Sequence, residues 1–244
     1  MQNHECAGIL DDILLEEEDI QIIHGGMIKN CERCFIVAKL PTPIKIGNDR
    51  IEKYVIIHWS HSGKAALTIR FSPVLQTSGR GIFLDAYAGR NKHEFKIRHT
   101  KSGPKRLNEA RNILSKAYSF FSEIEQSFKR LKEQPFDNSA MQHYLDTIFP
   151  STAEDNEPGR KATIAANRQA DVWTIFTEEA APTQWTAFTS ICEYTDSKEV
   201  NSQDPEKKSS RDENKLDNIW FGTGSKLKAK AFQSILYPLI GDEI

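Results

Sequence analysis

One seam of apolar residues constrains the fold of this chain more than any other feature, because it predicts a single long helix. Pro104 suits a first helical turn and the pattern stops at Gln134-Pro135, so we expect a helix over about 104–133. At about 1.5 Å per residue this helix is roughly 45 Å long. Its apolar side either packs across a sheet or also meets another subunit. The seam repeats at alternating spacings of three and four and consists of Leu107, Ala110, Leu114, Ala117, Phe121, Ile124, Phe128 and Leu131.

The residues before this helix have the signature of β-strands. They form short runs rich in β-branched and aromatic residues, and Pro41-Thr42-Pro43 breaks the first run. Ser60-His61-Ser62-Gly63 joins two of the runs and predicts a hairpin. We therefore expect an antiparallel sheet over about 20–99 with one face covered. The strand-like runs lie at 35–40, 54–59, 65–71, 82–84 and 95–98.

Apolar residues return to helical spacing after Pro135. The segment 196–217 is mostly polar, and we expect a flexible excursion there. The fold class is therefore α+β, with an antiparallel sheet, a long helix and a C-terminal helical region. We expect 20–150 and 151–244 to pack as one domain, after an acidic segment at 1–19. Further helices are expected at about 139–149, 160–181, 183–194 and 225–237.

Composition limits the classes of partner and compartment. The 244 residues carry a net charge of −2 and a pI near 6.4, so nucleic-acid binding needs a local basic patch. No apolar run approaches the roughly 20 residues that span a bilayer, and residues 1–6 have no signal-peptide character. Four cysteines are too few for a disulfide scaffold. We expect a cytoplasmic protein without a membrane partner.

The strongest local patch lies where the predicted sheet leads into the long helix. Eight basic residues fall between positions 90 and 111, and only Glu94 and Glu109 oppose them. Such a density of cations suits phosphate groups, and the start of a helix adds free backbone N–H groups. The alternative is a solvated strand edge and turn without a ligand. The basic residues are Arg90, Lys92, Lys96, Arg98, Lys101, Lys105, Arg106 and Arg111.

A second candidate for anion binding is the glycine-rich start of the last predicted helix. Phe221-Gly222-Thr223-Gly224-Ser225 precedes Lys226, Lys228 and Lys230. A hydroxyl residue can cap this helix, and Lys226 and Lys230 lie one turn apart on one side. The spacing of the glycines is not that of a P-loop. A capped and solvated helix is the alternative.

No arrangement of residues demands catalysis. His58, Ser60, His61 and Ser62 crowd one turn, but their spacing does not require a nucleophile activated by a base, and hairpin hydrogen bonding is the expected role. We expect no catalytic residue, no cofactor and no enzyme activity. One set has the right ligand types for zinc, although ordinary thiols are the simpler interpretation. This set is His4, Cys6, Cys31 and Cys34.

Several segments, taken in order, resemble a known family. They are 35–41 with Gly47-Asn48-Asp49, Ser60-His61-Ser62-Gly63, 97–100 with the long helix, Thr183-Gln184-Trp185 leading to Glu193-Tyr194-Thr195-Asp196, and 219–224 with the lysine helix. They resemble an uncharacterised bacterial family of phage/plasmid-like proteins, a domain of unknown function whose genes occur on phages, plasmids and integrative elements. The resemblance covers about 20–240 and implies a mobile-element protein that is shortened at its N-terminus.

The chain departs from the pattern of this family at two places. Gln76-Thr77-Ser78-Gly79-Arg80-Gly81 stands where the family tends to carry Cys-x-Asn-Thr, and Ser197 stands where it often has a histidine. Roles that depend on those residues are not expected here. The layout of a sheet followed by one long helix is also similar to the core of the single-strand-annealing recombination proteins of phages.

Two hypotheses follow from the residues and the resemblance. The first is a mobile-element protein that binds nucleic acid, such as single-stranded DNA in annealing or recombination, through the basic strand-to-helix junction. It would form an oligomer through the 104–133 helix. The alternative is a protein-binding inhibitor, an anti-defence module acting on a host protein complex, which the mild acidity and the acidic cluster at 11–19 favour. That cluster is otherwise a solvated face, or a decoy that competes for the basic surface.

Overall fold

The computed structural model describes residues 19–28, 33–60, 67–86, 94–96, 103–151, 160–178, 181–197 and 206–237, without the side chains of 103–111, 160 and 206–212. The predicted α+β class is confirmed, since strands come first and helices follow. The strands are β1 (Gln21–Ile28), β2 (Arg33–Lys39), β3 (Ile44–Ile46), β4 (Asp49–Ser60), β5 (Thr68–Gln76), β6 (Gly81–Phe83) and β7 (Glu94–Lys96). The helices are α2 (Gly103–Glu133), α3 (Asn138–Ile148), α4 (Arg160–Phe176), α5 (Gln184–Ser197), α6 (Glu206–Phe221) and α7 (Thr223–Leu236).

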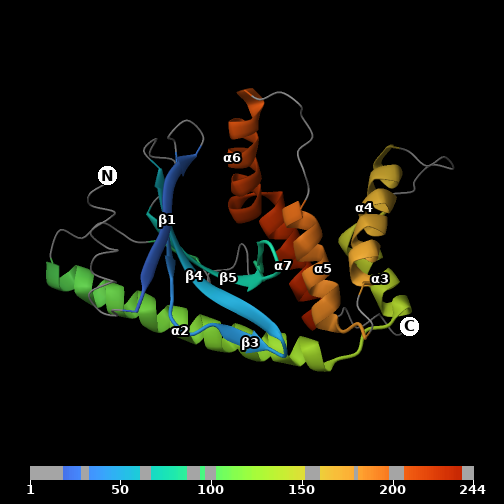
Figure 1. Cartoon of the computed structure of the whole chain (residues 1–244), viewed down its shortest axis with the longest axis horizontal. Coiled ribbons are helices and arrows are strands. Elements are labelled where there is room, and N and C mark those ends of the chain that lie inside the picture. Colours follow the sequence, from blue (N-terminus) through green and yellow to red (C-terminus); the bar gives the residue numbers. More distant parts are fainter. Residues whose placement is uncertain are drawn as a thin grey trace, which may run out of the picture. The chain divides into compact units, whose positions relative to one another are not determined.

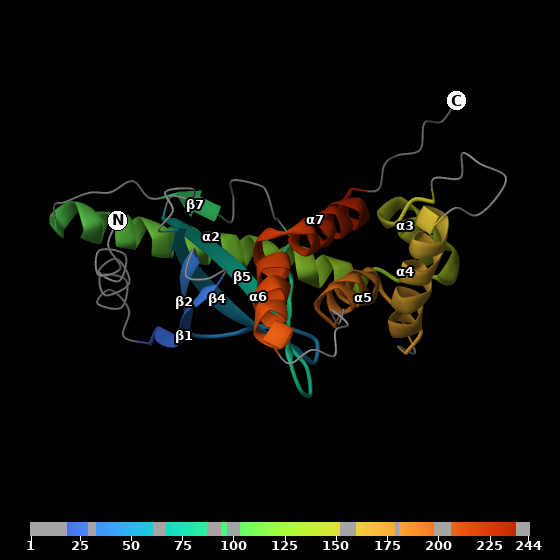
Figure 2. The same cartoon turned by 90° about the horizontal axis from the view of Figure 1, so that it is seen from above.

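The strands form one antiparallel sheet around the long strand β4. Its order is β1-β2-β4-β5-β6, while β3 also pairs with β4 and β7 with β5. Figure 2 shows β1 and β7 at opposite edges of the sheet. The predicted hairpin is confirmed, because β4 and β5 pair in register from Arg50 with Gln76 to His58 with Thr68. Residues that pair directly across antiparallel strands have side chains on the same face, so this register decides which residues share a face.

One face of the sheet is covered by α2. Phe71 of β5 is buried, and its ring centroid lies 5.7 Å from that of Phe120 and 6.2 Å from that of Phe121. Lys53 of β4 shares this face, and its Nζ lies over the ring of Tyr118 in α2. Figure 1 shows α2 (green) running along one side of the sheet. The long helix is thus confirmed, and Phe121 of its predicted seam packs on the sheet. Whether the seam also meets another subunit stays a prediction.

The described residues divide into two compact units. The first unit holds the sheet, α2 as far as Gln126 and α6 as far as Asp217. The second unit holds 84–86, the remainders of α2 and α6, and the helices α3, α4, α5 and α7. Whether 20–150 and 151–244 pack as one domain stays a prediction.

The second unit has an aromatic core built by α2, α5 and α7. The ring centroid of Phe128 lies 4.8 Å from that of Trp185 and 5.8 Å from that of Phe232. Tyr144 of α3 is buried, and its hydroxyl donates a 3.0 Å hydrogen bond to the carbonyl of Ala231. The predicted C-terminal helical region is confirmed. No helix in the described part of the chain has the length and apolar character needed to cross a bilayer.

Helix α6 stands where we predicted a flexible polar excursion over 196–217. The structure has helical residues from Glu206 to Phe221. The predicted polar segment ended at residue 217, just before the apolar residues that anchor the C-terminal end of α6. Ile219 and Trp220 are buried there, and Leu216 precedes them at helical spacing.

Truncation of Phe71 tests the packing of α2 on the sheet. Phe71→Ala removes a buried ring with three aromatic neighbours, Phe95, Phe120 and Phe121. We expect it to lower the free energy of unfolding by about 3–5 kcal/mol, because a cavity remains. Phe71→Leu keeps most of the side-chain volume, so its free energy of unfolding should fall clearly less. Urea unfolding measures both variants, and small, equal losses would contradict this packing.

Candidate functional site

The sheet face opposite α2 carries polar and charged side chains, and we call it the polar face. Lys39 of β2, Tyr54 of β4 and Ser72 of β5 share this face because they pair directly across the strands. The centre of the face is buried, and Arg70 of β5 is only 2 % exposed. Charged side chains are seldom buried without a role in pairing or binding, so the polar face is the first candidate for a functional surface.

Basic residues outnumber acidic residues on the polar face. Among the residues that the structure describes, the register assigns six basic residues and two carboxylates to it. Lys45, Arg50 and Lys96 are exposed, while Lys39 is partly exposed. The whole chain has a net charge of −2, so this surplus is local. The basic residues are Arg33, Lys39, Lys45, Arg50, Arg70 and Lys96, and the acidic residues are Glu52 and Glu94.

His58 is buried on the polar face, near two arginines. Burial, together with the charges of Arg33 and Arg70, lowers the pKa of His58 to about 3. The imidazole is therefore neutral at physiological pH and adds no charge to the face. A general acid or base works best when its pKa lies near the working pH, so His58 is poorly suited to that role.

Helix α6 reaches the polar face through one ion pair. Arg33 Nη1 lies 2.6 Å from Asp217 Oδ1, and both side chains are partly exposed. Because Arg33 points away from α2, the part of α6 in the first unit lies on the side of the sheet opposite α2. With Asp217 as a third carboxylate, six basic residues stand against three acidic ones in the described strands and this ion pair.

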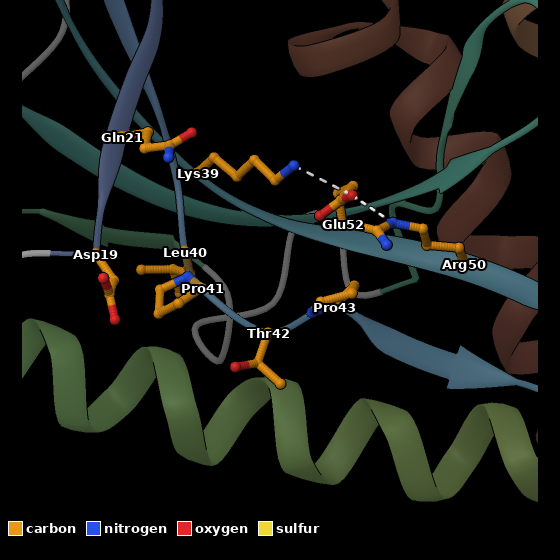
Figure 3. Close-up of a pocket in the computed structure, with 9 residues that line it drawn as sticks. All are labelled: Asp19, Gln21, Lys39, Leu40, Pro41, Thr42, Pro43, Arg50 and Glu52. Carbon is orange, nitrogen blue, oxygen red and sulfur yellow. Dashed lines mark hydrogen bonds and ion pairs between the residues drawn. The ribbon is translucent and has the colours of Figure 1, made fainter.

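Glu52 joins two basic residues at the margin of the polar face (Figure 3). Its Oε1 accepts a 2.8 Å hydrogen bond from Arg50 Nε and lies 3.2 Å from Lys39 Nζ. Burial alone would raise the pKa of Glu52, but the hydrogen bonds and charges of Arg50 and Lys39 hold it below its ordinary value. The carboxylate is therefore ionised at neutral pH, and the two cations leave the cluster with one net positive charge.

The basic segment predicted at 90–111 is described only in part. Lys96 is exposed on the polar face, in β7. The backbones of Lys105, Arg106 and Arg111 belong to α2, but their side chains lie outside the described part. Whether the segment continues the polar face stays a prediction. The residues of the segment outside the described part altogether are Arg90, Lys92, Arg98 and Lys101.

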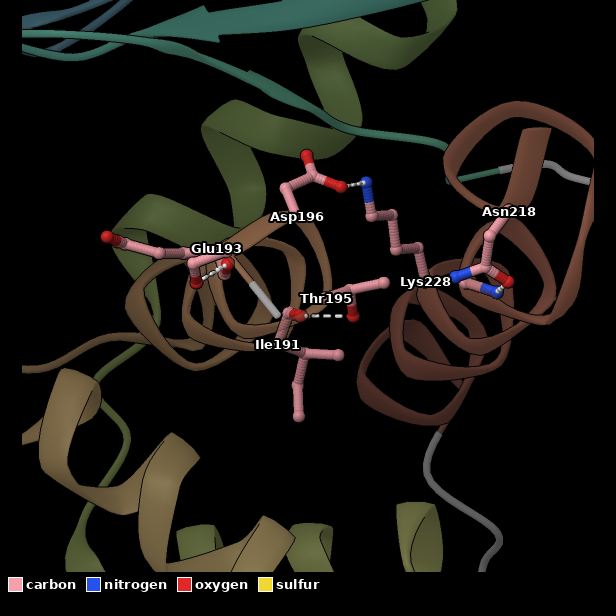
Figure 4. Close-up of polar contacts among 8 residues, drawn as sticks. Ile191, Glu193, Thr195, Asp196, Asn218 and Lys228 are labelled. Atoms are coloured by element: carbon pink, nitrogen blue, oxygen red, sulfur yellow. Dashed lines mark hydrogen bonds and ion pairs between the residues drawn. The ribbon is translucent and has the colours of Figure 1, made fainter. Parts of the chain in front are cut away.

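The structure corrects the prediction that Lys228 faces an anion. Its side chain is 0 % exposed, and its Nζ donates a 2.5 Å hydrogen bond to Asp196 Oδ1 inside the second unit (Figure 4). The Nζ of Lys230 donates to the carbonyls of Thr147 and Ile148 at the end of α3. Lys226 is exposed. The lysine helix therefore uses two of its three lysines to hold the second unit together.

The glycine-rich turn before α7 has a structural role. Asn218 Oδ1 accepts hydrogen bonds from Thr223 Oγ1 at 2.9 Å and from the Gly224 backbone at 3.1 Å. A Cβ atom on Gly222 would lie 2.8 Å from Asn218 Cα, and one on Gly224 would lie 3.0 Å from Thr195 Cγ2. The glycines allow this close packing, and an amide of the chain itself occupies the position where a phosphate was predicted.

The described residues offer no metal site. They contain no group of three or more His, Cys, Asp or Glu side chains that could hold a metal ion. Cys34 of the zinc candidate is buried in β2, while His4, Cys6 and Cys31 lie outside the description. The absence of catalysis and of a cofactor stays a prediction.

Sequence reasoning missed most basic residues of the polar face, because they are scattered along the chain and only the strand register brings them to one side. One signal was present: Arg70 stands between Ile69 and Phe71 in a predicted strand. A basic residue between two large apolar residues points away from the side that the apolar residues bury. The missed residues are Arg33, Lys39, Lys45, Arg50 and Arg70.

Comparisons with known proteins identify a family. The family model described as Domain of unknown function (DUF932) matches residues 1–220, a range that includes all strands of the sheet and ends within α6. No curated protein and no solved structure matches the chain.

Acid should destabilise the first unit through His58. The folded-state pKa of about 3 lies below the ordinary value of 6.5, so the unfolded chain takes up the proton first as the pH falls. Stability is therefore lost from about pH 6.5 down to about pH 3. Between pH 7 and pH 5 we expect the wild type to lose about 2 kcal/mol more than His58→Gln. Urea unfolding at both pH values measures this difference, and parallel losses would contradict a buried neutral imidazole.

Removal of one partner tests the buried pair of Lys228 and Asp196. Lys228→Met removes the cation beside a buried carboxylate, so we expect a loss of about 3–5 kcal/mol in the free energy of unfolding. The double variant Lys228→Met/Asp196→Leu should regain most of the lost free energy of unfolding. Lys226→Met, on the exposed side of the same helix, is the matched control. Equal midpoints of denaturation for Lys228→Met and Lys226→Met would show that Lys228 is not buried.

Proposed function

Because the chain belongs to the family described as Domain of unknown function (DUF932), and that description names no activity, we propose a function from the polar face. The chain binds single-stranded nucleic acid there. Its ligand is single-stranded DNA, in an annealing or recombination step of a phage- or plasmid-type mobile element. The basic segment at 90–111 extends the same surface, and the function includes no chemical step.

The charge of the polar face is the observation that carries this proposal. In the described part of the chain, six basic residues lie on it against three carboxylates, Asp217 included, while the whole chain has a net charge of −2. Clusters of this kind hold phosphates, because each neutralised phosphate releases counterions. The excess of acidic residues must lie elsewhere in the chain, so a polyanion is drawn to this face rather than to the rest of the surface.

The extent of the polar face suits a strand of several nucleotides. From Arg50 to His58 the strand β4 rises by eight residues, or roughly 26 Å at about 3.3 Å per residue. Exposed basic residues stand towards both ends of this distance: Lys45 pairs with Arg50, and Lys96 pairs with Thr68, which itself pairs with His58. A sheet face is a platform for single strands, whereas duplexes are read by an element that enters the major groove.

Burial divides the basic residues of the polar face by role. Arg70 is buried and Arg33 is held by Asp217, so both sustain the structure of the face. The exposed Lys45, Arg50 and Lys96 remain for direct contact with phosphates. The strand therefore lies along the exposed margins of the face, away from the ion pair of Arg33 with Asp217 of α6.

Removal of two exposed lysines tests the proposed surface. We expect the double variant Lys45→Ala/Lys96→Ala to bind single-stranded DNA about 10-fold more weakly at low salt. The slope of log affinity against log salt concentration should decrease in magnitude by about 1 to 2, because two phosphate contacts are lost. Fluorescence anisotropy with a labelled oligonucleotide measures both quantities.

The matched control is Arg130→Ala/Lys161→Ala, which removes two exposed cations from the second unit. We expect it to bind as the wild type does. An equal loss of affinity in both double variants would contradict the assignment to the polar face. If the wild type does not bind single-stranded DNA at low salt, the proposed function is wrong. Retention of one stoichiometric host protein after nuclease treatment, without DNA binding, would favour the alternative, a protein-binding inhibitor.

A further inference from the structure

An open pocket lies at the margin of the polar face, where β1 begins and β2 ends (Figure 3). It has a volume of about 270 Å³. Lys39, Glu52 and Arg50 line it from the polar face, and Pro41 and Pro43 line it from the turn that follows β2. The cluster of two cations and one carboxylate therefore borders a space that can receive a ligand.

Glu52 presents an unused acceptor at this pocket. Its side chain is 5 % exposed, and its Oε1 is shared by Arg50 and Lys39. Its Oε2 is buried and has no hydrogen-bond partner among the residues that the structure describes. Buried carboxylate oxygens without a donor are rare because they lose the hydrogen bonds of water, so this atom indicates a donor that the ligand supplies.

The two cations present unused donors beside that acceptor. A lysine ammonium has three N–H groups and an arginine guanidinium has five. Within the described residues, Glu52 Oε1 is the one side-chain partner of Lys39 Nζ and of the Arg50 guanidinium. Lys39 and Arg50 are partly exposed, so their other N–H groups can reach a ligand. The pocket, which Asp19 also lines, therefore places the free acceptor of Glu52 next to several cationic donors.

This pattern selects a neutral group that carries a donor next to an acceptor. A phosphate has acceptors only, and the ionised Glu52 repels it. A simple cation would meet Lys39 and Arg50. The Watson–Crick edge of a nucleobase combines N–H donors with ring or carbonyl acceptors, and single-strand binders read bases by this edge.

The turn beside the cluster offers apolar surface to the flat side of a ring. Pro41 and Pro43 are partly buried, and Thr42 between them has a φ of 58°. This backbone region is rare for residues other than glycine, so the surrounding structure holds the turn in one shape. A pocket that is fixed before binding loses less entropy when a base enters it.

We propose that this pocket binds one nucleobase, turned out of the strand on the polar face, with a base N–H donating to Glu52 Oε2 and a base acceptor facing Lys39 and Arg50. This assignment rests on the proposed function, because it supplies a base subsite to a surface that otherwise contacts phosphates. The base can belong to a nucleic-acid strand or to a free nucleotide, because both present the same Watson–Crick edge.

The test compares strands with and without bases. By fluorescence anisotropy, we expect the wild type to bind a single-stranded oligonucleotide about 10-fold more tightly than an abasic strand of equal length. Glu52→Gln should bind the abasic strand at least as tightly as the wild type does, because it removes a negative charge, and should lose most of this preference. Arg50 is largely exposed, so Arg50→Ala provides a second test if Glu52→Gln does not fold. This variant should also have a lower preference for the oligonucleotide over the abasic strand.

Each outcome separates this inference from the proposed function. Equal binding of the two strands by the wild type, or an unchanged preference in both variants, overturns the base subsite and leaves phosphate binding in place. If neither strand binds, calorimetry with nucleoside monophosphates and with ribose 5-phosphate decides. Binding of nucleotides alone then supports the pocket and rejects the proposed function, while no binding of any of these ligands rejects both.

Discussion

The packing of Phe71 against α2 decides how the rest of the first unit is organised. Its ring fixes which side of the sheet is apolar, because Phe120 and Phe121 lie against it. Alternation along β2, β4 and β5 then sends every second residue to the other side. A protein of this size could leave that second side to solvent. This chain instead places arginine, lysine, histidine and glutamate there, and covers part of them.

Burial of charge on the polar face is balanced locally. Asp217 of α6 meets Arg33, and Glu52 meets Lys39 and Arg50, so the cations at two points of the face have carboxylate partners. The balance is incomplete, and the remaining positive charge is what gives the face its affinity for a polyanion. His58 stays neutral at physiological pH and adds no further positive charge to the face.

Sequence predicted the elements of this fold better than its surfaces. The seam of α2 was readable because its period is regular, and the hairpin of β4 and β5 because a short polar turn joins two β-rich runs. The polar face depends on strand register, which brings together residues as distant as Lys39 and Lys96. Lys228 was misassigned because helical spacing gives a direction and not the neighbour in that direction, which here is Asp196.

The alternation of side chains between the two faces of β4 makes this strand intolerant of changes in length. Deleting one residue between Ile51 and Ile57 would exchange the two sides of the strand beyond the deletion. His58, beyond the deletion, would then turn towards α2, while the apolar Ile57 and Trp59 would turn to the polar face. Natural variants of this sheet should therefore differ in the length of the connections between strands. The number of residues in β4 should change by two or not at all.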